Sequence, residues 1–394
     1  MAAEDFTTYT EVDPNSRVAV SAGAITVSAV GRNEDAYVYK DMGAGAITSF
    51  MVELQVNISN TGVGNGSFIV MWGASNNVQD FNGWTTYGIS IWAYYNAGVY
   101  TFYVKDKNGT QSGGITFSAN TNYYLRFARD NTTACLSVYS DAARTTVVGT
   151  NTIECTNTAY RYQYAFTTYN DGNALYMTAT LTGATLDPAT VGTLGSASME
   201  FTDDGWEQTA DSGVYNNYAD FFRFGYYAAY GYGSGNLMCA LPVPAGAKVI
   251  GAAVRLMRNV TRAFTTPITL YGIDEDNTAL PADWAGRWGA RTLTTANAPW
   301  TFPTGSDGGA SMSPDFGAAM QEVVDRAGWA SGNNFGLYLK NSTSAGDSTQ
   351  YIRSTNHATA SNRPYLFSLY RVAPAAGGII VPVMGSQYRR RWAA

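Results

Sequence analysis

The chain has 394 residues, of which 45% are hydrophobic and only 14% are charged, and it carries 41 Gly and 28 Tyr. This length suits two domains that each bury a core of their own. The net charge is -6, and the basic residues are spread thinly except near the C-terminal end, so no stripe is predicted that could neutralise phosphates and nucleic acid is not expected as a partner.

The N-terminal segment Met1–Asp5 lacks a basic stretch followed by an apolar run, so no secretory signal is predicted there. No stretch approaches the roughly 20 apolar residues that cross a bilayer, so membrane insertion is not expected. Three cysteines, Cys135, Cys155 and Cys239, are too few and too scattered for a disulfide framework or a zinc site. Cys135 and Cys155 could lie near each other, but buried free thiols are the favoured interpretation.

Short strands are predicted from residue 24 to about residue 181. The clearest is at residues 50–58, where every second residue is apolar, a pattern typical of a strand with one buried face. Asn-Gly at 108–109 and Asp-Gly at 171–172 favour two-residue hairpin turns and antiparallel pairing. About ten strands in one unit indicate two stacked sheets. The other predicted strands are 67–72, 87–95, 99–105, 123–129, 134–139, 162–168 and 175–181.

A short Pro, Gly and Thr segment at residues 187–192 interrupts this pattern, so we predict a first domain at 1–186, a linker at 187–197 and a second domain at 198–372. One helix is predicted in the second domain, from the N-cap Ser313 and Pro314 to Gly328, with Phe316 and Met320 on its buried stripe. The predicted strands are 235–241, 248–258, 268–273, 335–339 and 365–370. The fold class is therefore all-β, with two β-sandwich (jelly-roll) domains, the second carrying one packed α-helix, and an extended C-terminal tail.

The tail, residues 373–394, begins with a hinge-like Ala, Pro and Gly segment. An apolar strand and three arginines follow, a combination that suits addition to a sheet edge or groove of another subunit. A final strand of the second domain itself is the alternative. The predicted assembly residues are Ile379, Ile380, Val381, Val383, Met384, Arg389, Arg390 and Arg391.

Residues for catalysis are scarce. His357 is the single histidine, which excludes a two-His metal site, and no Gly-x-Ser-x-Gly elbow precedes it. Glycoside cleavage needs two facing carboxylates, whereas the strand at 51–58 carries only Glu53. We therefore predict no enzyme activity, no catalytic residues and no cofactor.

A metal site has one candidate, the acidic segment at residues 274–277, where Asp274 and Asp276 could hold a calcium ion. Consecutive side chains diverge, so a solvated turn is the favoured interpretation.

Aromatic residues are dense between residues 215 and 232, where Gly225, Gly231 and Gly233 argue against a regular strand throughout. The segment could be a partly exposed contact loop or simply core. Trp72, Trp84 and Trp92 face the same choice, with core favoured. The candidate residues for glycan or subunit contact are Trp84, Tyr94, Tyr95, Tyr226, Tyr227, Tyr230 and Tyr232.

The first domain resembles the concanavalin-like lectin/glucanase sandwiches of phage and metagenomic proteins. The residues that carry the resemblance are 5–15 (DFTTYTEVDPN) and 32–41 (RNEDAYVYKD). The Glu-x-Asp-x-x-Glu acid motif of the glucanases is missing, so the resemblance implies the fold without hydrolysis.

The second domain resembles the β-sandwich modules of the DNRLRE kind, which occur in surface, adhesive and virion proteins. The motifs are 241–247 (LPVPAGA), 321–333 (QEVVDRAGWASGN) and 361–366 (SNRPYL). The resemblance implies display or adhesion, and no catalytic residues come with it.

Together these observations predict a non-catalytic structural surface component of a bacteriophage virion, as a capsid decoration, fibre or tail-associated protein. Its expected location is the virion, and its expected partners are other virion proteins and copies of itself. The alternative is a carbohydrate-binding adhesin that attaches to host surface glycans.

Overall fold

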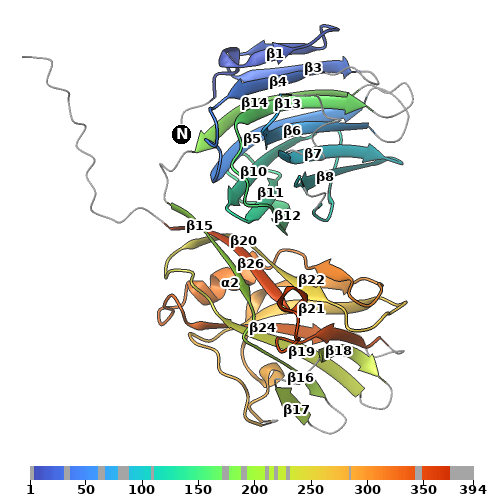
Figure 1. The fold of residues 1–394 in the computed structure, drawn as a ribbon, viewed down its shortest axis with the longest axis vertical. Coiled ribbons are helices and arrows are strands. Elements are labelled where there is room, and N and C mark those ends of the chain that lie inside the picture. Colours follow the sequence, from blue (N-terminus) through green and yellow to red (C-terminus); the bar gives the residue numbers. More distant parts are fainter. Residues whose placement is uncertain are drawn as a thin grey trace, which may run out of the picture.

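The fold was analysed in a computed structural model, which describes residues 4–30, 36–60, 67–78, 88–107, 111–170, 177–187, 193–208, 213–216, 221–227, 231–283, 285–341 and 348–372. Figure 1 shows two strand-rich units, one above the other. Within the described residues no helix combines the length and apolar character needed to cross a membrane. The tail assigned to assembly, Trp84 and Tyr230 lie outside these residues.

Two antiparallel sheets of seven strands each form the first domain, more strands than the ten predicted. Sheet A has the order β1 (Thr10–Val12), β4 (Tyr37–Asp41), β13 (Tyr162–Asn170), β6 (Ser67–Ser75), β7 (Gly88–Asn96), β8 (Val99–Lys105) and β9 (Ile115–Phe117). Sheet B has the order β12 (Val147–Glu154), β11 (Thr133–Tyr139), β10 (Asn122–Asp130), β5 (Phe50–Asn60), β14 (Met177–Asp187), β3 (Ala24–Val30) and β2 (Val18–Ser21).

The core of the first domain lies between sheets A and B, as the alternating pattern predicts. Val52 and Leu54 of β5 are fully buried in the same apolar cluster as Ile89 and Ile91 of β7. Every second side chain of a strand points to the same face, so each sheet also has an outer face turned away from this core. The outer face of sheet A carries an aromatic cluster, and the outer face of sheet B packs against the second domain.

The second domain is a smaller sandwich. Sheet C has the order β15 (Thr193–Glu200), β26 (Tyr365–Val372), β20 (Lys248–Met257) and β23 (Ala310–Met312). Sheet D has the order β17 (Gly213–Asn216), β16 (Asp203–Gln208), β19 (Gly231–Ala240), β24 (Asn334–Asn341), β21 (Thr266–Ile273) and β22 (Leu293–Phe302), and β18 (Phe221–Tyr227) pairs with β19 and with β25 (Gln350–Arg353). The predicted all-β class with two sandwiches and one packed helix is confirmed.

The helix α2 (Gly317–Val324) is shorter than predicted. It does not begin at Ser313, because the Ser313 amide donates to the Val254 carbonyl and the Val254 amide donates to the Ser313 hydroxyl, which ties this segment to β20. Phe316 and Met320 are buried against the sheets, as the predicted stripe requires.

Two further expectations differ from the structure. Gly225 lies in β18 and Gly231 and Gly233 lie in β19, so the prediction that these glycines prevent regular strands was wrong. Gly225 has φ +115°, and a Cβ there would lie 2.3 Å from the Ser348 carbonyl oxygen, so the strand continues because this residue lacks a side chain. In addition, β15 begins at Thr193, inside the range predicted as linker, because it pairs along its length with β26.

The two domains touch through the outer face of sheet B. Met51, Ala128 and Cys135 form a buried apolar cluster with Leu369 of β26, and Ile250 of β20 packs against it. All three cysteines are buried and free, which confirms the favoured interpretation.

Polar contacts surround this cluster. The Arg255 guanidinium lies 2.9 Å from the Glu154 carboxylate, and the hydroxyls of Thr133 and Ser198 lie 2.9 Å apart. Both pairs join the first domain to the second, so the domains hold a defined relative position.

A buried carboxyl lies beside the interface. Asp315 Oδ1 accepts hydrogen bonds from the amides of Ala252 (2.6 Å) and Gly317 (3.2 Å). Burial disfavours the charged form more than these donors favour it, and it raises the pKa of Asp315 from 3.8 to about 6. The contribution of this carboxyl to stability is therefore present below its unfolded-state pKa and is lost as the pH rises through about 6.

We expect Asp315→Asn to remove this pH dependence, because the amide keeps an oxygen acceptor and carries no charge. Near pH 7 the variant should be more stable than the wild type by up to about 3 kcal/mol, and near pH 4 the two should be similar. Urea unfolding at both pH values measures the difference. A variant less stable than the wild type at pH 7 would show that the two amide donors outweigh burial.

Candidate functional site

The outer face of sheet A carries a cluster of aromatic side chains. Trp92 and Tyr164 are buried with Val70 in this cluster, and partly buried rings pack against them. The partly buried members are Tyr37, Tyr39, Tyr103 and Tyr162. They come from β4, β13, β7 and β8, so the cluster spans most of the width of the sheet.

Register explains how these residues meet. Tyr39 of β4 is paired with Tyr164 of β13, and Trp92 of β7 is paired with Tyr103 of β8. Directly paired positions point to the same face. The rings of Tyr39 and Tyr164 lie 5.8 Å apart, and Tyr39 also meets Tyr162 edge to face at 5.9 Å. These distances are typical of favourable aromatic pairs.

Small residues separate the tyrosines of β4 and β13 from the Trp92 and Tyr103 pair of β7 and β8. Gly73 of β6 is paired with Tyr164 on one side and with Ser90 of β7 on the other. Ser90 is in turn paired with Lys105 of β8. The row therefore runs from tyrosines through glycine and serine to a lysine beside the Trp92 indole, with the smallest side chains in the middle.

A hollow of about 260 Å³ lies at the Trp92 end of this face, and its described lining residues are Trp92, Tyr94, Tyr103 and Gln111. Tyr94 and Tyr103 are half-buried, their rings lie 6.3 Å apart, and Gln111 is exposed. The hollow thus combines ring faces with an amide that can both donate and accept hydrogen bonds.

Two contacts fix the indole of Trp92. Its Nε1 donates to Ser90 Oγ at 2.7 Å, and Lys105 Nζ lies 4.2 Å from the ring centroid. Partial burial lowers the pKa of Lys105. A cation over an indole face is attracted by the ring quadrupole, so the lysine and the indole hold each other in place.

The alternation of side chains along β7 places the predicted contact residues Tyr94 and Tyr95 on opposite faces of sheet A. Tyr94 lines the hollow, whereas Tyr95 is its neighbour on β7 and lies on the other face, where its ring is 4.7 Å from that of Tyr100. Trp72 is core, packed 4.6 Å from Phe50. Trp92 is mostly buried but belongs to the outer face, a position that the sequence alone did not distinguish from core.

The aromatic segment of the second domain serves mainly as core. Phe222 and Phe224 of β18 are fully buried, while Phe221 stacks on Trp206 at 6.0 Å. Tyr226 is half-buried and its amide donates to Ser348 Oγ. Tyr227 and Tyr232 lie in β18 and β19, and Tyr230 falls outside the described residues, so the contact role of all four tyrosines stays a prediction.

The acidic segment predicted as a solvated turn or calcium site is paired with arginines. Arg326 contacts Asp274 and Asp276 at 2.6 Å each, and Arg291 contacts Glu275 at 3.1 Å. No group of three or more potential metal ligands occurs among the described residues. Calcium binding here stays an untested alternative to the favoured solvated turn, and it would have to displace Arg326.

The sequence did not indicate that two acidic residues, Asp204 and Glu207, are buried. Asp204 accepts hydrogen bonds from the Thr355 amide and hydroxyl, and Glu207 accepts from the Gly289 amide and the Tyr338 hydroxyl. Burial raises the pKa of both carboxyls. Each acid closes a loop onto β16.

His357 closes a turn in the same way, because its Nδ1 accepts from the Thr359 amide at 3.1 Å. This hydrogen bond of the imidazole is therefore local to its own loop.

No protein-family model matches the chain, and no curated protein matches it. Structurally similar solved proteins include a legume lectin-like domain from Entamoeba histolytica, at 14% sequence identity and a TM-score of 0.36. The match covers 46% of this chain and 90% of that chain. Lectin II from Ulex europaeus (10%, 45% and 97%, TM-score 0.30) and a carbohydrate esterase from the Shiga toxin-encoding bacteriophage phi24B (10%, 45% and 89%, TM-score 0.32) are also similar. At these TM-scores, the assignment of the first domain as a sandwich depends on its own two sheets.

We expect Ser90→Ala to loosen the Trp92 indole, because it removes the hydroxyl that accepts from Nε1. The loss should be about 1 kcal/mol in the free energy of unfolding, the usual size for a hydrogen bond of this kind. Thermal unfolding of Ser90→Ala beside Ser90→Thr measures it, since threonine keeps the hydroxyl. Equal losses in the two variants would contradict a role for the hydroxyl.

Proposed function

We propose that the chain is a non-catalytic glycan-binding protein and that the hollow on the outer face of sheet A holds a sugar ring. The observation that carries the proposal is the hollow itself, where Trp92, Tyr94 and Tyr103 surround a space of about 260 Å³ beside Gln111. A sugar ring has an apolar C–H face and a rim of hydroxyls. Aromatic faces and one amide supply a surface for each part.

The Trp92 indole has a fixed position. The Ser90 hydroxyl and the Lys105 ammonium both fix Trp92, so a ligand would meet a ring that is already in position. A pre-ordered ring loses little conformational entropy on binding, which favours affinity.

Binding without cleavage suits the residues at the hollow. Glycoside hydrolysis needs two carboxyl groups about 5 to 9.5 Å apart across the scissile bond. The described lining residues are three aromatics and an amide, and none is a carboxylic acid. This composition supports a binding role over a catalytic one.

We expect Tyr94→Ala and Tyr103→Ala each to weaken glycan binding about tenfold, because each removes one stacking face worth about 0.5 to 1.5 kcal/mol together with buried area. Tyr95→Ala is the matched control, because Tyr95 is adjacent in β7 and lies on the opposite face. A broad glycan array followed by calorimetry on the strongest glycan measures the effect. A flat array, or equal losses in all three variants, would contradict the proposal.

A second proposal concerns the setting in which the protein acts, the surface of a bacteriophage virion. The resemblances of the two halves of the chain support it, and so does the composition of residues 373–394, an apolar segment on a Pro- and Gly-containing tether followed by three arginines. Such a segment suits addition to another subunit. Glycan binding and a place on a particle are compatible, since attachment requires both.

Cutting the chain after Val372 should abolish incorporation into particles and leave both sandwiches folded, because β26 ends at that residue. Far-ultraviolet circular dichroism and thermal unfolding check the folding. Electron microscopy with the truncated chain as the only copy checks the assembly. Particles that carry the truncated protein at normal occupancy would contradict the assembly role of the tail.

A further inference from the structure

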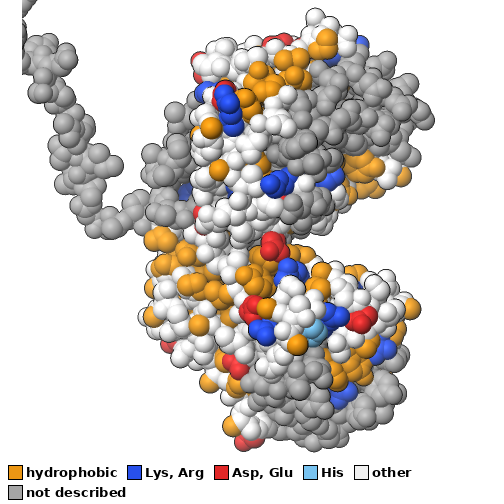
Figure 2. All heavy atoms as spheres, in the orientation of Figure 1, with side chains coloured by type: hydrophobic (Ala, Val, Ile, Leu, Met, Phe, Trp, Pro, Cys, Tyr) orange, Lys and Arg blue, Asp and Glu red, His pale blue; other side chains and the backbone are white. Residues whose placement is uncertain are grey.

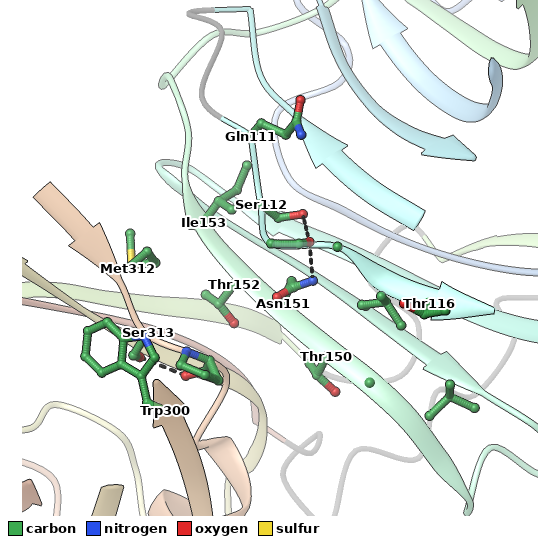
Figure 3. A pocket seen from close by; sticks show the side chains of 16 residues that line it. Gln111, Ser112, Thr116, Thr150, Asn151, Thr152, Ile153, Trp300, Met312 and Ser313 are labelled. Carbon is green, nitrogen blue, oxygen red and sulfur yellow. Dashed lines mark hydrogen bonds between the residues drawn. The ribbon is translucent and has the colours of Figure 1, made fainter. Parts of the chain in front are cut away.

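A second hollow, of about 570 Å³, opens between the two domains. Figure 3 shows Met312, Ser313 and Trp300 of the second domain on one side, and Ser112, Asn151 and Thr152 of the first domain facing them. This volume lies within the range of sites that hold small molecules, about 300 to 1,000 Å³. We call this hollow the interdomain cleft.

The cleft is neutral. Its described lining residues combine hydroxyls, amides, glycine backbone and one indole with the apolar side chains of Ile115, Val148, Ile153, Met312 and Pro314, and none of them is charged. The charged side chains in Figure 2 are scattered singly or in small groups over both domains. A phosphate or a charged peptide would find no counter-charge among the described lining residues, whereas hydroxyl groups would find partners of their own kind.

The walls of the cleft are fixed. Asn151 Nδ2 donates to the Gly113 carbonyl at 2.7 Å, which ties the loop before β9 to β12. Ser112 Oγ accepts from the Val104 amide at 2.9 Å. Across the cleft, Ser313 is held to β20. These contacts anchor residues on both sides of the cleft, and the Arg255 to Glu154 ion pair joins the two domains.

Gln111 connects the cleft to the aromatic hollow, because it lines both of them. Thr116 and Thr150 lie along the cleft beyond it, on β9 and β12. A ligand long enough to leave the hollow past Gln111 would therefore enter the cleft.

We propose that the interdomain cleft binds a further stretch of the same glycan, so that the protein takes a neutral oligosaccharide chain across both domains rather than a single sugar. The inference depends on the glycan binding proposed above and extends it to a class of ligand. Trp300 supplies an aromatic edge in the cleft, and the hydroxyl and amide groups of β12 supply hydrogen bonds.

The test uses the full chain and neutral oligosaccharide series of increasing length, from disaccharide to octasaccharide, of β-1,4-glucan, α-1,4-glucan, β-1,4-mannan and β-1,4-xylan. Affinity for one series should rise with length by about tenfold or more beyond the shortest member that binds. Thr150→Arg places a long charged side chain in the cleft and should remove this gain while leaving the affinity for the short member unchanged.

Val147→Arg is the matched control. Val147 lies on the same strand, is 57% exposed and is not among the described lining residues of the cleft, so this variant should keep the gain with length. Thermal unfolding of both variants shows that they fold.

Affinity that does not change with length, or a gain that survives Thr150→Arg, would overturn the interdomain inference and leave glycan binding in the aromatic hollow standing. Binding of no member of any series, in agreement with a flat glycan array, would instead overturn the proposed function and the inference together.

Discussion

The close approach of the two domains depends on one missing side chain. A Cβ at Gly251 would lie 2.5 Å from Cys135 Sγ and 2.6 Å from Thr152 Oγ1, so glycine alone lets β20 settle against the outer face of sheet B. The Cys135 thiol then lies 3.6 Å from the Ile250 carbonyl. Thr152 lines the interdomain cleft, so the same contact that joins the domains sets one wall of the cleft.

The outer faces of the two sheets of the first domain differ in what they contact and expose. Sheet B gives its outer face to the second domain, through Met51, Ala128 and Cys135. Sheet A carries aromatic rings on its outer face instead, and the hollow near Gln111 opens there. A sandwich whose core is already complete can use one face for rigidity and the other for a ligand.

Much of the fold follows from local patterns in the sequence. The alternation at residues 50–58 predicted the strand and its buried face, and Phe316 and Met320 predicted the buried stripe of the helix. The helix start was misplaced because Ser313 bonds to a strand more than fifty residues away, a contact that no local signal records. The continuation of β18 through Gly225 likewise depends on the Ser348 backbone beside it.

The candidate site was only partly predictable. Tyr94 was singled out by its aromatic character, whereas Tyr103 joins it through the register of the next strand, β8. Tyr39 and Tyr164 meet through the register of β4 and β13, which are distant in the sequence. Tyr94 and Tyr95 are adjacent in the sequence and lie on opposite faces. A period-two reading of β7 from Ile89 and Ile91 would have separated them, because those two residues mark the core side.

A crystal structure of the full chain with the glycan that binds it best tests glycan binding in the aromatic hollow most directly. We expect a sugar ring against Trp92, Tyr94 and Tyr103, with a hydroxyl within hydrogen-bond reach of Gln111. A glycan bound only at another surface, with this hollow holding solvent alone, would contradict it.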